Sequence, residues 1–145
     1  FTYGTDASKP LRVRFFERFG TYYNGKLNEF RTRVNYRPSM KISVAAVHEW
    51  DRFRFPQGIF NVHIGSLNTS YSFNRFLTTS LLFQVNSIDQ HPFSMNFRLR
   101  WNYRPDSDFF VIYTLGNQFN SLAAGNPILT REQRFTVKYT YSFLK

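Results

Sequence analysis

Basic residues at alternate positions are the feature of this sequence that comes nearest to a site for chemistry. The ones that we single out are Arg31, Arg33, Arg98, Arg100 and Lys138. Alternate residues of a β-strand point to the same side, so in extended segments these side chains would share one polar face. Cationic groups that line a narrow passage concentrate anions and set selectivity. One interpretation is therefore an anion-attracting wall.

A second interpretation is that the same basic residues form ion pairs. Their partners would be acids on strands outside this sequence or acids of this chain, namely Glu17, Glu29, Glu49 and Asp51. The interiors of small closed sheets are filled by side chains, so we favour ion pairing over an open passage.

No residue pattern indicates an enzyme, a metal site or a cofactor. His48, His63 and His91 are scattered and lack the spacing that metal ligands need. Glu49 and Asp51 share one strand face, but without an opposing partner we expect ion pairing rather than acid–base catalysis. Cysteine is absent, as are the nucleophile-elbow, P-loop and dinucleotide-binding motifs. We therefore predict no catalytic residue, no metal and no cofactor.

The elements that carry these residues have a period of two, which is typical of β-strands. Residues 92–104 alternate strictly between apolar and polar types. The same alternation, with interruptions, occurs in further segments: 11–22, 29–36, 40–50, 59–73, 77–86, 108–115 and 134–143. In 59–73 the apolar phase shifts, which we interpret as a β-bulge near Gly65.

Short turns separate most of the strand segments. Turn sequences such as Asn24-Gly25 and Arg37-Pro38-Ser39 leave no room for the crossovers that parallel strands need. The exception is a long loop that we predict at 116–130. The sequence therefore predicts an all-β fold, an antiparallel up-and-down meander of about eight strands in one domain over 1–145.

Aromatic residues make up 20% of the chain, with 18 Phe and 9 Tyr, which is far more than a soluble core of this size needs. Many lie near strand ends at every second turn, and therefore at one end of a meander. We predict that these rings form an aromatic girdle where lipid meets water. Its members are Tyr36, Tyr71, Phe73, Trp101, Tyr103, Tyr139, Tyr141 and Phe143.

The net charge of +10 does not by itself predict nucleic-acid binding. A platform for single strands needs aromatic rings and arginines on the same face, because the rings stack on bases while the arginines hold the phosphates. Here rings and arginines alternate and lie on opposite faces. We therefore expect no nucleic-acid partner.

Several motifs resemble one known family. They are RLRWNYRPDSDFFVIY at 98–113, RPS at 37–39, FPQGIF at 55–60, YSF at 71–73 and VKYTY at 137–141. Together they resemble the C-terminal part of the uncharacterised outer-membrane β-barrel domain that follows a family-9-like carbohydrate-binding module in Gram-negative proteins. Members of that family are several times longer, which implies that this chain holds the last strands of a larger barrel. The family has no established functional residues to carry over.

These observations lead to one prediction for the whole chain and one alternative. No apolar run reaches the ~18 residues of a transmembrane helix, so only a barrel would let this chain cross a bilayer. We predict a transmembrane β-barrel, or the C-terminal part of a larger one, in the outer membrane of a Gram-negative bacterium. It would act as a passive pore or a structural scaffold.

The predicted partners are the lipid bilayer and either the remaining strands of a longer chain or other envelope proteins. The chain starts at Phe1 within a strand-like pattern, so we expect it to be a fragment. The alternative is a soluble β-sandwich that binds carbohydrate, in which the apolar face packs on a second sheet.

Overall fold

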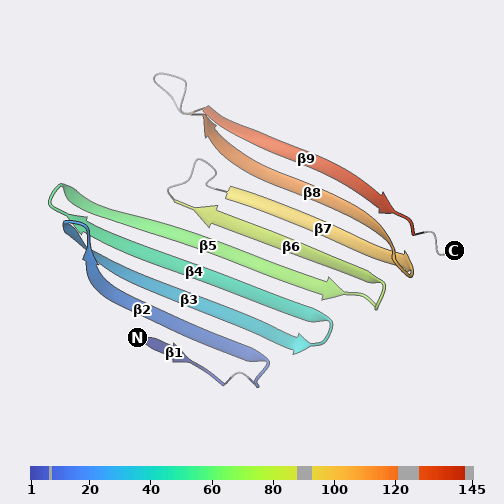
Figure 1. The fold of residues 1–145 in the computed structure, drawn as a ribbon, viewed down its shortest axis with the longest axis horizontal. Coiled ribbons are helices and arrows are strands. Elements are labelled where there is room, and N and C mark those ends of the chain that lie inside the picture. Colours follow the sequence, from blue (N-terminus) through green and yellow to red (C-terminus); the bar gives the residue numbers. More distant parts are fainter. Residues whose placement is uncertain (7, 88–92, 121–127, 143–145) are drawn as a thin grey trace.

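The fold is one open antiparallel β-sheet with up-and-down topology (Figure 1). The computed structural model describes residues 1–6, 8–87, 93–120 and 128–142. Within them the strands pair in the order of the sequence. Their bounds are β1 (Thr2–Gly4), β2 (Leu11–Tyr22), β3 (Gly25–Ser39), β4 (Ile42–Phe55), β5 (Gly58–Ser72), β6 (Leu77–Asn86), β7 (Phe93–Arg104), β8 (Ser107–Asn120) and β9 (Ile128–Thr140).

The predicted all-β antiparallel meander is confirmed, with nine strands among the described residues instead of about eight. The additional strand is β1, whose three residues are too few to show a period of two. Over the part of the chain that the structure describes, no helix is both long and apolar enough to span a membrane.

Two tight connections contain residues in the left-handed backbone region. Tyr23 has a φ of 51° between β2 and β3, and Asp106 has a φ of 55° between β7 and β8. Tight hairpins commonly need positive φ at a central turn residue, because this matches the right-handed twist of the strands. The turn sequences therefore set the register of the two hairpins, which begins at the pairs Tyr22–Gly25 and Arg104–Ser107.

The β-bulge predicted near Gly65 is wrong. The register between β4 and β5 is continuous from the pair Ile42–Tyr71 to the pair Phe55–Gly58. The apolar side chains change from one face of β5 to the other without an extra residue. The phase shift therefore means that the two halves of β5 are apolar on opposite faces.

The long loop predicted at 116–130 is also wrong for residues 116–120 and 128–130. β8 continues to Asn120 and β9 begins at Ile128, and the two strands pair throughout. Glycine and asparagine have low strand propensity, but hydrogen bonding to the neighbouring strand outweighs this local preference. Residues 121–127 lie outside the described residues.

The sheet has almost no hydrophobic core of its own. The buried apolar side chains among the described residues are Leu27 and Val62. A globular protein of this mass would expose about 7,800 Å² of surface, whereas this chain exposes 10972 Å². Neither face of the sheet is covered by a second layer of the described structure.

Gly25 provides a test of the packing between the β2–β3 hairpin and β4. A Cβ atom added at Gly25 would overlap the Arg54 carbonyl oxygen and lie 2.6 Å from Phe55 Cδ1. Gly25→Ala should therefore lower the free energy of unfolding by about 1–3 kcal/mol. Urea denaturation measures this change.

Gly20→Ala is the matched control in the same hairpin, because an added Cβ there meets no atom within 4 Å. It should change the free energy of unfolding by no more than about 0.5 kcal/mol. Equal effects of the two substitutions would contradict the described pairing of β3 with β4.

Candidate functional site

The two faces of the sheet differ in chemistry over most of their area. Directly paired residues on neighbouring strands share a face, so a rung of such pairs identifies each face across the sheet. One rung of the apolar face, which we call the central rung, joins Tyr36, Val44, Thr69, Leu81, Phe97, Tyr113 and Phe135. The adjacent rung of the polar face joins Asn35, Ala45, Asn68, Leu82, Asn96, Thr114 and Arg134.

Aromatic rings line the apolar face where β3, β5, β7 and β9 end, on the right in Figure 1. We call this line the tyrosine border. Its residues are Tyr36, Tyr71, Trp101, Tyr103, Tyr139 and Tyr141, all members of the predicted girdle. The Tyr103 and Tyr139 rings stack at 5.6 Å, and the Phe73 ring lies 4.7 Å from that of Tyr71. Phe143, the remaining predicted member, lies outside the described residues.

A second aromatic row crosses the apolar face near the opposite strand ends. The Phe30 ring stacks on Trp50 at 5.3 Å, and Trp50 stacks on His63 at 6.2 Å. We call the line through Phe30, Trp50, His63, Phe93 and Phe135 the far border. Sequence analysis missed this row, although the phase shift in 59–73 was a signal of it.

Polarity reverses beyond the far border. The next residues on the apolar side of the sheet are polar, and they are Asn28, Arg52, Asn61, Asn117 and Gln133. On the other side, Leu27 and Val62 become the buried apolar residues noted above. The apolar face is therefore a band of limited width, bounded by aromatic residues on both sides.

The apolar band is inclined to the rungs. On the tyrosine border, Tyr36 lies on the central rung. Trp101 lies four residues beyond the central rung in β7, and Tyr141 lies six residues beyond the central rung, just after the end of β9. On the far border, Phe30 precedes the central rung by six residues, Phe93 precedes it by four, and Phe135 lies on it.

Both borders thus descend in the same direction between β3 and β9. A descent of about six residues is about 20 Å along the strands, and six strand spacings are about 29 Å across them, so the inclination is about 35°. The width of the band in β5, from His63 to Tyr71, is about 27 Å along the strand.

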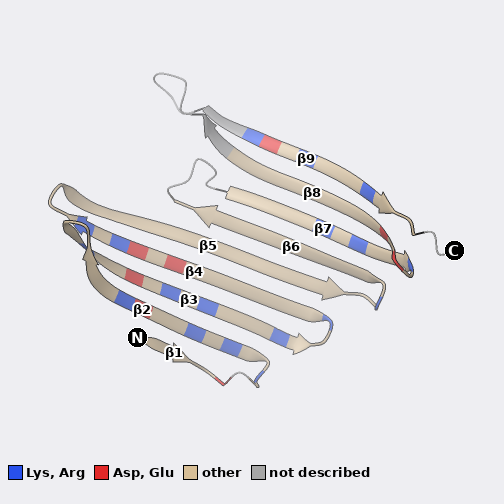
Figure 2. Cartoon of the chain, in the orientation of Figure 1, with Lys and Arg blue, Asp and Glu red and all other residues tan. Residues whose placement is uncertain are grey.

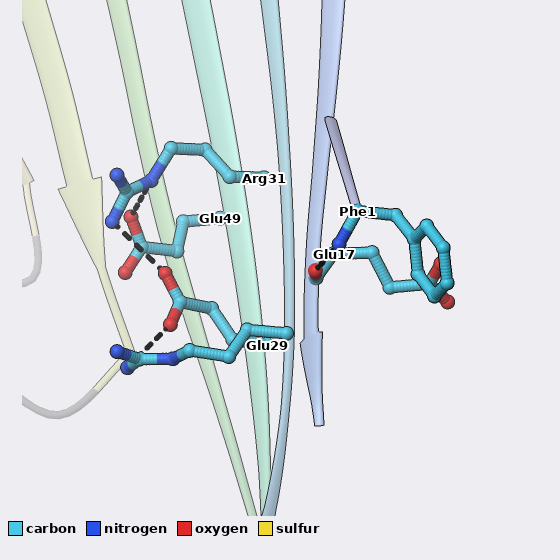
Figure 3. Close-up of polar contacts among 6 residues, drawn as sticks. Phe1, Glu17, Glu29, Arg31 and Glu49 are labelled. Carbon is cyan, nitrogen blue, oxygen red and sulfur yellow. Dashed lines mark hydrogen bonds and ion pairs between the residues drawn. The ribbon is translucent and has the colours of Figure 1, made fainter. Parts of the chain in front are cut away.

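Arg31 is the centre of an ion-pair network on the polar face (Figure 3). Its Nε donates to Glu49 Oε2 at 2.6 Å, and its Nη2 donates to Glu29 Oε1 at 3.1 Å. The other oxygen of Glu29, a residue only 5% exposed, contacts Arg18 Nη2 at 2.6 Å. The predicted ion pairing is therefore confirmed for Arg31.

Arg100 is also paired, through two hydrogen bonds to Asp108 at 3.0 and 2.9 Å. Sequence analysis had not named Asp108 as a partner. The prediction that Glu17 pairs with these basic residues is wrong, because its register with Phe30 puts it on the apolar face. Figure 3 shows Glu17 on the other side of the strands from Arg31.

The remaining predicted basic residues have no acidic contact within the described structure. These are Arg33, Arg98 and Lys138, which lie on the polar face with Arg31 and Arg100. Basic residues are concentrated on β2, β3, β4, β7 and β9, whereas β5 and β6 carry no charged residue (Figure 2). On β5 and β6 the polar face is formed largely by serine, threonine, asparagine and glutamine.

Two side-chain clusters resemble metal sites but lack the features of one. Oxygen atoms of Glu29, Glu49 and Asp51 lie within 4.8 Å of one another, but arginines already occupy the first two carboxylates. His48 and His63, which looked scattered in the sequence, stack at 5.7 Å with Nε2 and Nδ1 3.5 Å apart. We interpret the acids as part of the ion-pair network, His63 as part of the far border and His48 as its stacking partner on the same face.

The Arg31 network should contribute to stability. Arg31→Met leaves Glu49 without its cation and buried Glu29 with one partner instead of two, so it should lower the free energy of unfolding by roughly 1–3 kcal/mol. Adding Glu49→Gln should restore part of the loss, because it removes the unpaired charge.

Arg98→Met is the control for this substitution, since Arg98 lies on the same face without an acidic contact in the described structure. It should alter the free energy of unfolding by no more than about 0.5 kcal/mol in the same urea titration. A loss as large as that of Arg31→Met would contradict a specific role for the network.

Comparisons of the chain with protein-family models, with curated proteins and with solved structures find no match. The resemblance to the outer-membrane domain therefore stays a prediction.

Proposed function

We propose that this chain forms part of the wall of an outer-membrane β-barrel that serves as a passive pore or a structural scaffold. The apolar face contacts lipid, and the polar face lines the interior of the barrel. The open edges at β1 and β9 pair with further strands or with each other when the barrel closes.

The observation that carries this proposal is the inclined apolar band with aromatic residues on both borders. Strands of membrane barrels tilt by about 35–45° from the barrel axis. A membrane boundary therefore crosses the rungs of the sheet obliquely, as both borders do here. At an inclination of about 35°, the band in β5 is about 22 Å tall, close to the ~25 Å apolar belt of such barrels.

The absence of a second layer supports the same proposal. Monomeric soluble proteins rarely leave a contiguous apolar surface of more than a few hundred Å² uncovered. This face extends over all the long strands of the described sheet and needs a cover. Lipid covers such a face and also accounts for the aromatic borders, because tyrosine and tryptophan favour the membrane–water interface.

The polar face is consistent with an interior surface that favours anions. Arg33, Arg98 and Lys138 add positive charge that no acid of the described residues neutralises. The Arg31 network, in contrast, resembles the packed ion pairs of a filled interior. The chain therefore combines features of a pore and of a scaffold, and β3 carries both, through Arg33 and Arg31.

The uncovered apolar face also fits a β-sandwich, which would be a soluble binding module. A second sheet would cover the face, but it would not require aromatic residues on two parallel, inclined borders. The sandwich predicts a protein that stays soluble without detergent, and the barrel predicts one that does not.

The two tryptophans allow a direct test, because Trp50 lies on the far border and Trp101 on the tyrosine border. In lipid vesicles, both should be quenched by brominated lipids, and more strongly by bromine near the headgroups than by bromine near the bilayer centre. The variants Trp50→Phe and Trp101→Phe report on each tryptophan separately.

A single tryptophan on the polar face serves as the control. Ser66→Trp in a chain without Trp50 and Trp101 should resist brominated lipids, because Ser66 shares its face with Val47 and Gln84 on the interior side. Equal quenching at Ser66→Trp and at the native tryptophans, or no quenching at any of them, would contradict the proposal.

A further inference from the structure

Basic residues surround a hollow on the polar face, at the same strand ends as the tyrosine border. The hollow has a volume of about 360 Å³ and is formed by β2, β3 and the connection before β2. Its lining consists of Lys9, Pro10, Arg12, Arg14, Arg33, Asn35 and Arg37. Among the described residues, none of its five cations has an acidic contact, which sets it apart from the Arg31 network.

The pairing of β2 with β3 places like charges directly opposite each other in this hollow. Arg14 is the partner of Arg33, and Arg12 is the partner of Asn35 on the next rung of the same face. Like charges in directly opposed positions of a sheet destabilise the pairing. The sheet holds this arrangement without an acid of its own, so an anion from outside the described residues would relieve the repulsion.

Arg12 adds an independent observation. Its Nε is buried and has no hydrogen-bond partner. A buried donor without an acceptor costs free energy, and each such group in a native structure calls for an explanation. An oxyanion in the hollow would supply an acceptor after a rotation of the Arg12 side chain that opens Nε to it.

We propose that this hollow is a binding site for a compact polyanion that carries phosphate groups. Guanidinium groups present their donors in a planar fork that matches phosphate oxygens, and four of the five cations are arginines. The hollow is at the small end of the range for ligand pockets. Its size suits a small phosphorylated solute or the headgroup of a phospholipid.

The site lies on the face that the proposed function assigns to the barrel interior, but the inference depends only on β2, β3 and Lys9. Binding is therefore measured in whichever medium keeps the purified protein monodisperse, detergent or plain buffer. A failure of binding would leave the proposed membrane insertion untouched, and a soluble protein could still bind phosphate.

Isothermal titration with pyrophosphate at low ionic strength tests the site. The wild-type chain should bind pyrophosphate saturably, and Arg14→Gln and Arg33→Gln should each weaken binding at least tenfold. Arg98→Gln removes a charge from the same face outside the hollow and should change the affinity less than twofold. Titration with dihexanoyl phosphatidic acid distinguishes a lipid headgroup from a free solute, according to which probe binds more tightly.

Thermal denaturation separates a binding defect from a folding defect. Arg14→Gln removes a repulsion, so without ligand its melting temperature should equal or exceed that of the wild type. Pyrophosphate should raise the melting temperature of the wild type and not that of Arg14→Gln. The proposal is overturned if neither phosphate probe binds, or if the three variants weaken binding equally, which would indicate only a general attraction to the basic face.

Discussion

The need to cover one apolar sheet face governs the rest of this structure. The described strands satisfy their backbone hydrogen bonds by pairing in sequence order, so backbone hydrogen bonding does not require a second layer. The apolar side chains do require a cover, because Leu27 and Val62 alone cannot form a core for the described residues. The bilayer that we propose as the cover would also explain why the apolar face ends in aromatic rows and why those rows cross the rungs obliquely.

The polar face follows from the same constraint. If lipid covers one face, as we propose, each strand has only its other face for charge, and the alternation concentrates the arginines there. On β2, β3 and β4 the charges divide into two groups. Arg31 neutralises Glu29 and Glu49, whereas Arg14 and Arg33 oppose each other without an acid. The first arrangement stabilises a packed interior, and the second leaves positive charge available to a ligand.

Much of the fold could be predicted from the sequence because a period of two specifies both strand and face. The strict alternation around Phe97 and Arg98 correctly predicted the strand β7 and which of its residues share a face. Pairing was harder, because the link between Arg100 and Asp108 depends on a hairpin register that is set by the turn together with an irregularity between Asn102 and Arg104. The change of face in β5 produces the same pattern as a bulge, so one strand in isolation could not distinguish them.

The orientation of the apolar face is the central claim, and site-directed spin labelling along β7 tests it most directly. The chain has no cysteine, so single cysteines introduced from Met95 to Arg100 each carry one label. In lipid vesicles, labels at Met95, Phe97 and Leu99 should be accessible to oxygen dissolved in the lipid, and labels at the alternate positions to a water-soluble nickel chelate. Labels at the odd positions that are shielded from both reagents would show that another protein layer covers this face, and would contradict the account.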